Sequence, residues 1–106
     1  MSVLLPIRTY SLTNSRVHWR VRSQRAKQQR QAACLVAPKA ALPCVVTMTR
    51  IGPRKLDDDN LQGALKSIRD GIADKLGVDD SDARIAWRYN QAIGKEFGVE
   101  IAVAPN

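Results

Sequence analysis

Apolar residues recur at helical spacing more clearly in one segment than anywhere else in the chain. Between Leu61 and Leu76 they lie three or four residues apart, at positions 61, 64, 65, 68, 72 and 76. This spacing predicts an amphipathic helix over 61–76 that packs one face against a core.

Residues that favour helix ends flank this segment. Gly77 followed by Val78 is typical of a C-terminal cap with its hydrophobic contact. At the other end Asp59 or Asn60 is the expected N-cap, and Gln62 lies three residues after Asp59 as in a capping box.

Alternating or β-branched apolar residues predict strands at four other places. Pro6 confines the first of them to a sheet edge or a strand start, because proline has no N–H to donate. In the segment that runs from about Arg16 to Ala37, just before Pro38, the second half is expected to be a helix and becomes apolar from Ala32. The expected strands cover Val3 to Thr9, residues 44–51 before the Gly52-Pro53 breaker, residues 85–89 and residues 99–103.

The order strand-helix-strand-helix-strand-strand predicts an α+β fold, with a small mixed or antiparallel sheet covered by the two helices. The 106 residues suit a single domain, 1–106, whose modest core a partner subunit could complete.

No apolar run reaches the ~20 residues of a membrane span, and the first residues lack the regions of a signal peptide. We therefore expect a cytoplasmic protein with no membrane partner. Cys34 and Cys44 are too few for a disulfide scaffold and lack the spacing of metal ligands, so we expect them to be small buried hydrophobes.

Charge is divided unevenly along the chain. Residues 1–56 contain eleven Lys or Arg and no acid, whereas residues 57–106 contain all ten acids and six bases. The two parts therefore carry +11 and −4, which sum to the net +7. This asymmetry indicates a basic surface that binds a polyanion and a separate cluster of acids. The acids repel phosphate, so they can contact it only if a cation neutralises them.

The basic residues of the first predicted helix favour contact with nucleic acid. If the helix begins early, Arg16, Arg20, Lys27 and Arg30 fall within about 80° at ~100° per residue. A solvated helix face is the structural alternative, but such a face normally mixes both signs. Trp19 could stack on an unpaired base or anchor the segment to the core, and we favour the core. His18 is expected to be a phosphate contact or a surface residue. The candidate DNA-binding residues are Arg16, Arg20, Arg22, Arg25, Lys27, Arg30, Arg54 and Lys55.

Three consecutive acids, Asp57, Asp58 and Asp59, precede the clearest helix, and VDDSD follows it. Helix capping and a solvated turn explain each cluster separately, yet one cap needs only one acid. The surplus favours a cation, and carboxylates without His or Cys suit Mg²⁺, with Mn²⁺ as the second choice. An EF-hand loop from Asp57 does not fit, because its sixth and twelfth positions are Gln62 and Ile68. Mg²⁺ beside a phosphate-attracting surface suits phosphodiester hydrolysis, with Lys55 or Lys66 stabilising the charge that develops.

DDDN, an amphipathic helix and then GVDDSD resemble the RusA family of Holliday junction resolvases, whose pattern is Asp-x-Asp-Asn, a helix and Asp-Asp before a strand. The match covers about Arg50 to Tyr89, and the rest of the chain agrees in the order of its elements. The resemblance implies a homodimeric, RusA-like domain. Its implied activity is that of a Mg²⁺-dependent endodeoxyribonuclease that resolves four-way DNA junctions in recombination and repair, often phage-encoded. The catalytic, metal-binding carboxylates would be Asp57, Asp59 and Asp80.

The lysine of the family pattern is displaced in this chain. It usually lies three residues after the Asn, where this sequence has Gly63. Lys66 lies one turn later on the same side of the helix and is the candidate catalytic lysine.

Helix length creates a geometric conflict for the carboxylates. A helix over 61–76 spans about 22 Å at ~1.5 Å per residue. The flanking residues recover at most ~20 Å at ~3.4 Å per residue, so Asp59 and Asp80 do not readily meet. Either the helix bends or ends early at Gly71, or Asp80 joins the Asp57/Asp59 cluster of a two-fold partner.

Two other interpretations of the sequence stay open. A non-catalytic basic nucleic-acid-binding protein would use the acids only to cap a helix and repel wrong partners. An adaptor that binds another protein would have no salt-dependent affinity for DNA.

Overall fold

A four-stranded mixed sheet and two helices make up the computed structural model, which describes residues 1–10 and 19–106. The element order confirms the predicted α+β fold. The elements are β1 (Ser2–Leu5), α1 (Trp19–Val36), β2 (Cys44–Gly52), α2 (Asp58–Leu76), β3 (Ile85–Ile93) and β4 (Gly98–Pro105).

The strands follow the spatial order β1-β4-β2-β3. Helix α2 connects β2 to the parallel strand β3, while β4 runs antiparallel to both β2 and β1. Strand β1 lies at an edge, as Pro6 predicted, but it ends at Leu5 and not at Thr9. The missing N–H of Pro6 explains why pairing stops there.

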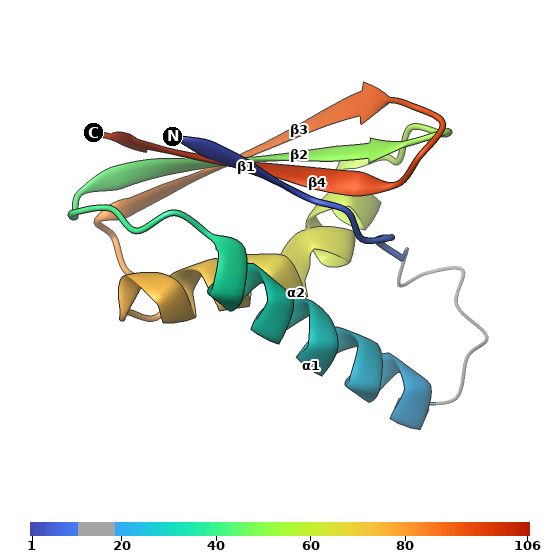
Figure 1. Cartoon of the computed structure of the whole chain (residues 1–106), viewed down its shortest axis with the longest axis horizontal. Coiled ribbons are helices and arrows are strands. Elements are labelled where there is room, and N and C mark those ends of the chain that lie inside the picture. The colour runs from blue at the N-terminus through green and yellow to red at the C-terminus, as the bar shows by residue number, and fades with distance from the viewer. Residues whose placement is uncertain (11–18) are drawn as a thin grey trace.

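Both helices cover the same face of the sheet (Figure 1). Alternate residues of β2, namely Cys44, Val46 and Met48, are buried on that face. They meet a buried stripe of α2 that includes Leu65 and Ile68. In the described part of the chain, no helix covers the opposite face of the sheet (Figure 1). Neither helix in that part is long and apolar enough to cross a membrane.

The two cysteines are unpaired, as the sequence predicted. Cys44 is buried in β2, and its burial raises the pKa of its thiol. Cys34 lies on α1 and is only half-buried. The expectation of a buried hydrophobe is therefore confirmed for Cys44 and met in part for Cys34.

The start of α2 differs from the prediction. Asp57 is the N-cap, because its Oδ1 accepts a hydrogen bond of 2.9 Å from the Asn60 amide. The helix therefore begins at Asp58, and the predicted capping box between Asp59 and Gln62 is wrong. Any of three consecutive acids can cap a helix, so local sequence could not select among them.

The end of α2 matches its prediction. Gly77 adopts the left-handed conformation, with φ of 77°. Its N–H donates to the Asp74 carbonyl, and the Val78 N–H donates to that of Ala73. These are the two hydrogen bonds of a Schellman cap.

Gly71 has a different role from the one expected. Helix α2 continues past it to Leu76, so the early end of the helix, one of the alternatives that the sequence left open, does not occur. A Cβ atom at Gly71 would lie 2.2 Å from the Arg30 carbonyl oxygen and 2.8 Å from Cβ of Ala33. The glycine therefore allows α1 to approach α2 closely where the helices cross.

Replacement of Gly71 by alanine should destabilise the fold although alanine is the better helix former. The added methyl group must push the α1 backbone away, so we expect a loss of about 2 kcal/mol. Urea unfolding of Gly71→Ala measures this loss. Gln62→Ala, on an exposed position of the same helix, should change stability by no more than about 0.5 kcal/mol. A stabilising Gly71→Ala would contradict the close crossing.

Candidate functional site

The loop after α2 brings Asp80 back alongside the helix. The Lys66 ammonium lies 3.0 Å from Asp80 Oδ2 and 2.8 Å from Asp70 Oδ1. Two predicted site residues, fourteen positions apart in sequence, are therefore in direct contact. Asp70 was not predicted, although it lies four residues after Lys66, a spacing that brings two helical side chains together.

Arg69 holds the backbone and the side chain of Asp80 together. Its Nη2 donates to the Asp80 carbonyl at 3.1 Å, and its Nε lies 3.1 Å from Asp80 Oδ2. The indole N–H of Trp87 donates to the same carbonyl at 2.9 Å, and the Arg69 guanidinium stacks on that indole ring. Arg69 Nη1 also donates to the Tyr89 hydroxyl at 2.7 Å.

None of Arg69, Trp87 and Tyr89 was predicted as a site residue. The inward alternation of Trp87 and Tyr89 along β3 was visible in the sequence. Their convergence on Arg69 requires the strand to lie beside α2, which only the tertiary fold provides. These three side chains position Asp80 from both the helix and the sheet.

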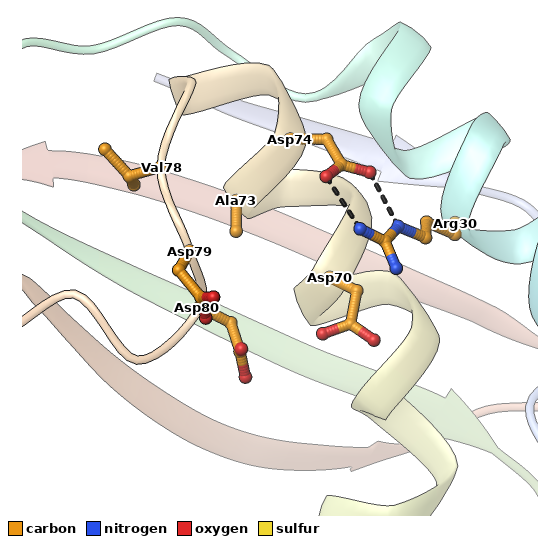
Figure 2. Close-up of a pocket in the computed structure, with 7 residues that line it drawn as sticks. All are labelled: Arg30, Asp70, Ala73, Asp74, Val78, Asp79 and Asp80. Carbon is orange, nitrogen blue, oxygen red and sulfur yellow. Dashed lines mark hydrogen bonds and ion pairs between the residues drawn. The ribbon is translucent and has the colours of Figure 1, made fainter.

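A hollow of about 390 Å³ lies beside this contact, between α1, α2 and the loop after α2. Figure 2 shows Arg30 of α1 reaching Asp74 of α2, with Asp70 next to this pair and Asp79 and Asp80 across the hollow. Arg30 donates to both carboxylate oxygens of Asp74, at 2.7 and 2.9 Å. This forked ion pair links α1 to α2 close to the crossing at Gly71.

The paired charges alter the pKa values of the acids at the hollow. The hydrogen bond from Lys66, with smaller contributions from Asp79 and Arg69, lowers the pKa of Asp80. Hydrogen bonds to Asp70 and Asp80 raise the pKa of Lys66, so this lysine stays protonated well above neutral pH. The hydrogen bond from Arg30 lowers the pKa of Asp74.

The three acids at the start of α2 are exposed to solvent. Asp57 uses one carboxylate oxygen for the cap, while Asp59 points from the first turn of the helix. Lys66 follows Asp59 by seven residues, on the same side of α2 but about 10 Å further along it. Within residues 1–10 and 19–106, no three acids, histidines or cysteines gather as a metal site. Asp80 thus lies level with the middle of α2, separated along the helix from Asp57 and Asp59.

Two side chains of the sheet fix the segment that leads into these acids. Gln91 on β3 accepts from the Leu56 N–H at 2.8 Å and donates to the Leu56 carbonyl at 2.7 Å. Arg50 on β2 donates to the Arg54 carbonyl and, at 3.2 Å, to the Thr9 hydroxyl. Arg50 is only 5% exposed, and this burial lowers its pKa.

The candidate DNA-binding residues are spread over α1 and the loop before α2. Arg20, Arg22, Arg25 and Lys27 lie on α1, and Arg54 and Lys55 are exposed just before Asp57. Arg30 is on the same helix but paired with Asp74. Arg16 and His18 lie outside the described residues.

Trp19 is the first residue of α1, and it is 66% exposed. The expectation that it anchors the segment to the core is therefore wrong. An aromatic ring inside a basic stretch looks the same in sequence whether it packs inward or outward.

Comparison with known proteins gives no assigned activity. No protein-family model matches the chain. A protein of Xylella fastidiosa strain Temecula1, described as uncharacterized, is 39% identical over 94 residues. The alignment covers 74% of this chain and 60% of that protein, so the chain spans about three fifths of the relative's length.

Replacement of Lys66 by glutamine should raise the pKa of Asp80 toward the ordinary value near ~3.9, because its strongest hydrogen bond is lost. A lowered pKa in the folded state stabilises the fold above the unfolded value and ceases to do so as pH falls through the folded value. The variant should therefore be less stable than wild type at neutral pH, and the difference should shrink as pH falls below the ordinary carboxyl value of ~3.9. Carbon-13 NMR titration and urea unfolding measure the two effects.

Lys75→Gln provides the matched control, since Lys75 donates to the Leu35 carbonyl rather than to a carboxylate. It should leave the pKa of Asp80 unchanged. An Asp80 pKa that does not move in Lys66→Gln would mean that the two side chains do not pair in solution.

Proposed function

We propose that this chain is a RusA-like, Mg²⁺-dependent endodeoxyribonuclease that acts as a homodimer on four-way DNA junctions in the cytoplasm. The observation that supports this most directly is the contact between Lys66 and Asp80. It brings the acid after α2 to a lysine on the helix that Asp57 caps and whose first turn contains Asp59. The contact therefore joins Asp80, one acid of the pattern that resembles the RusA family, to the candidate lysine.

The donor set suits the proposed cation. Asp57 and Asp59 offer carboxylate oxygens at the start of α2, and Asp57 keeps one oxygen that the cap does not use. Hard oxygen donors without His or Cys favour Mg²⁺ or Mn²⁺. When bound, such an ion lowers the pKa of an attacking water and stabilises the charge that grows on the phosphate.

Lys66 supplies a fixed positive charge in this proposal. Its raised pKa keeps it an ammonium ion at neutral pH, and Asp70 and Asp80 hold it in place. An ammonium ion positioned beside a phosphodiester stabilises the negative charge of the transition state. The exposed Arg54 and Lys55, immediately before Asp57, are placed to attract the DNA backbone to the acids.

The proposed homodimer resolves the separation between the acids. Within one chain, Asp59 and Lys66 lie about 10 Å apart along the axis of α2. Asp80 contacts Lys66 and is therefore separated from Asp59 by a similar distance along the helix. A two-fold partner could place its own Asp80 at the Asp57 and Asp59 of the first chain. Two such sites related by a two-fold axis would suit a junction with the same symmetry.

A non-catalytic DNA-binding protein is the second candidate. Its support is that Asp57 caps α2 and that no three acids gather within the described part of the chain. In this candidate the pairing of Asp80 with Lys66 and Arg69 is purely structural.

Cleavage of a labelled four-way junction tests the proposed activity. Wild-type protein should make paired nicks with Mg²⁺ and none in EDTA. Asp59→Asn should lower the rate at least about a hundredfold and keep or increase affinity for the junction, because a negative charge is removed. Glu100→Gln, an exposed carboxylate on β4, is the matched control and should cleave normally. Tight binding without cleavage by wild type would favour the second candidate.

Mixed dimers test whether the site is shared between subunits. Asp59→Asn and Asp80→Asn should each be inactive, but dimers containing one of each would retain one intact site. With random pairing, half of the co-expressed dimers are mixed, and each mixed dimer has one intact site of two. Co-expression should therefore restore single nicks, with about a quarter of the active sites of the wild-type protein. Recovery of no activity, with dimers present by light scattering, would place all the acids of a site in one chain.

A further inference from the structure

Two arginines and two aromatic rings form a cluster at one end of the molecule, which we call the aromatic–arginine cluster: Arg8, Tyr10, Arg25 and Phe97. The Arg8 guanidinium lies over the Phe97 ring at 4.7 Å and over the Tyr10 ring at 5.2 Å. The Arg25 guanidinium lies 3.9 Å from the centre of the Tyr10 ring. These residues come from the segment after β1, from α1 and from the turn between β3 and β4.

The cluster brings two positive charges together on one pair of rings. Among the residues that the structure describes, no carboxylate forms an ion pair with Arg8 or Arg25. Two guanidinium groups that share one ring repel each other, and an anion between or beside them would relieve that repulsion. The cluster therefore has the charge of a phosphate-binding surface and, in Tyr10 and Phe97, the rings of a stacking surface.

The cluster is held in position by the fold. Tyr10, Arg25 and Phe97 are half-buried, and Arg8 is exposed. The Gln29 side chain donates to the Arg8 carbonyl at 3.1 Å, which ties this segment to α1. A bound group would thus meet side chains whose rotamer freedom is already restricted.

Arg50 connects the cluster to the acidic end of α2. Its guanidinium donates to Thr9, between Arg8 and Tyr10 in sequence, and to the Arg54 carbonyl, three residues before Asp57. In Figure 1 the segment after β1, the turn between β3 and β4 and the start of α2 lie at the same end of the molecule. A nucleic-acid strand that contacts the cluster would therefore run toward the acids.

We propose that the aromatic–arginine cluster binds an unpaired nucleotide at the branch point of DNA, with its rings stacked on the base and its guanidinium groups on the adjacent phosphates. This assignment rests on the proposed function, and it specifies the feature of branched DNA that the protein recognises. Stacking on an aromatic side chain needs a free base face, which a continuous duplex does not offer and an opened junction does. Phosphate contacts alone would not distinguish the two forms of DNA.

Affinity measurements in EDTA, where no cleavage occurs, test the proposal with three labelled DNAs: a four-way junction, a duplex of the same sequence and a single strand. Tyr10→Leu should weaken binding to the junction and the single strand about tenfold and change duplex affinity by less than about twofold. Tyr10→Phe keeps the ring and should bind as wild type. Arg25→Gln should weaken binding to all three DNAs, and more than Lys39→Gln, an equal loss of charge on an exposed residue outside the cluster.

A fluorescent base analogue at the branch point gives a second readout. Stacking quenches its emission, so wild type should change the signal of the bound junction in a way that Tyr10→Leu does not. Phe97→Leu should reproduce the result if Tyr10→Leu proves poorly folded by circular dichroism.

The outcomes separate this proposal from the proposed function. Equal weakening of duplex and junction by Tyr10→Leu would overturn it, since the cluster would then contact phosphates only. Unchanged affinities in folded Tyr10→Leu and Phe97→Leu would also overturn it. If wild type cleaves junctions and both variants bind DNA normally, only the proposal for the cluster is refuted. If the variants lose affinity for the single strand but wild type does not cleave junctions, only the proposed nuclease activity is refuted.

Discussion

Burial of one apolar stripe of α2 fixes the direction of every other side chain on that helix. The stripe packs between the sheet and α1, and Gly71 lets α1 approach closely enough to complete the cover. Once that face is set, Asp59, Lys66 and Asp70 must emerge along one side of α2, because they lie seven and four residues apart. The loop after the helix then needs only a few residues to return Asp80 to that side. The rotation of α2 about its axis therefore decides both which of its side chains pack in the core and where its charged side chains lie.

Ion pairing and helix capping explain part of the concentration of acids in the second half of the chain. Asp74 pairs with Arg30 and links α2 to α1, and Asp80 pairs with Lys66 and links the loop after α2 to that helix. Asp70 and Asp82 pair within their own segments, with Lys66 of α2 and with Arg84. Within the described residues, Asp57, Asp58 and Asp59 form no ion pair, and only Asp57 serves as a cap. Two exposed acids in the first turn exceed what capping requires. This excess is the part of the charge pattern that the fold alone does not explain.

Sequence periodicity predicted the larger elements because each has a strong local signal. Helix α2 has an uninterrupted apolar stripe and a glycine cap, and β3 and β4 alternate with period two. The errors occurred where tertiary contacts decide. Gly71 has no local feature that distinguishes a helix crossing from a bend, and exposed Trp19 resembles a core residue in sequence. Arg69 is one of many basic residues until Trp87 and Tyr89 of β3 are brought beside it.

Side chains of the sheet hold the five residues between β2 and α2 in place. Arg50 restrains this connection near its middle, and the Gln91 side chain bonds both the backbone N–H and the backbone carbonyl of Leu56. The conformational entropy of the connection is therefore lost when the protein folds. A ligand that engages the acids at the start of α2 meets a segment that is already ordered, so little of its binding free energy is consumed in ordering that segment.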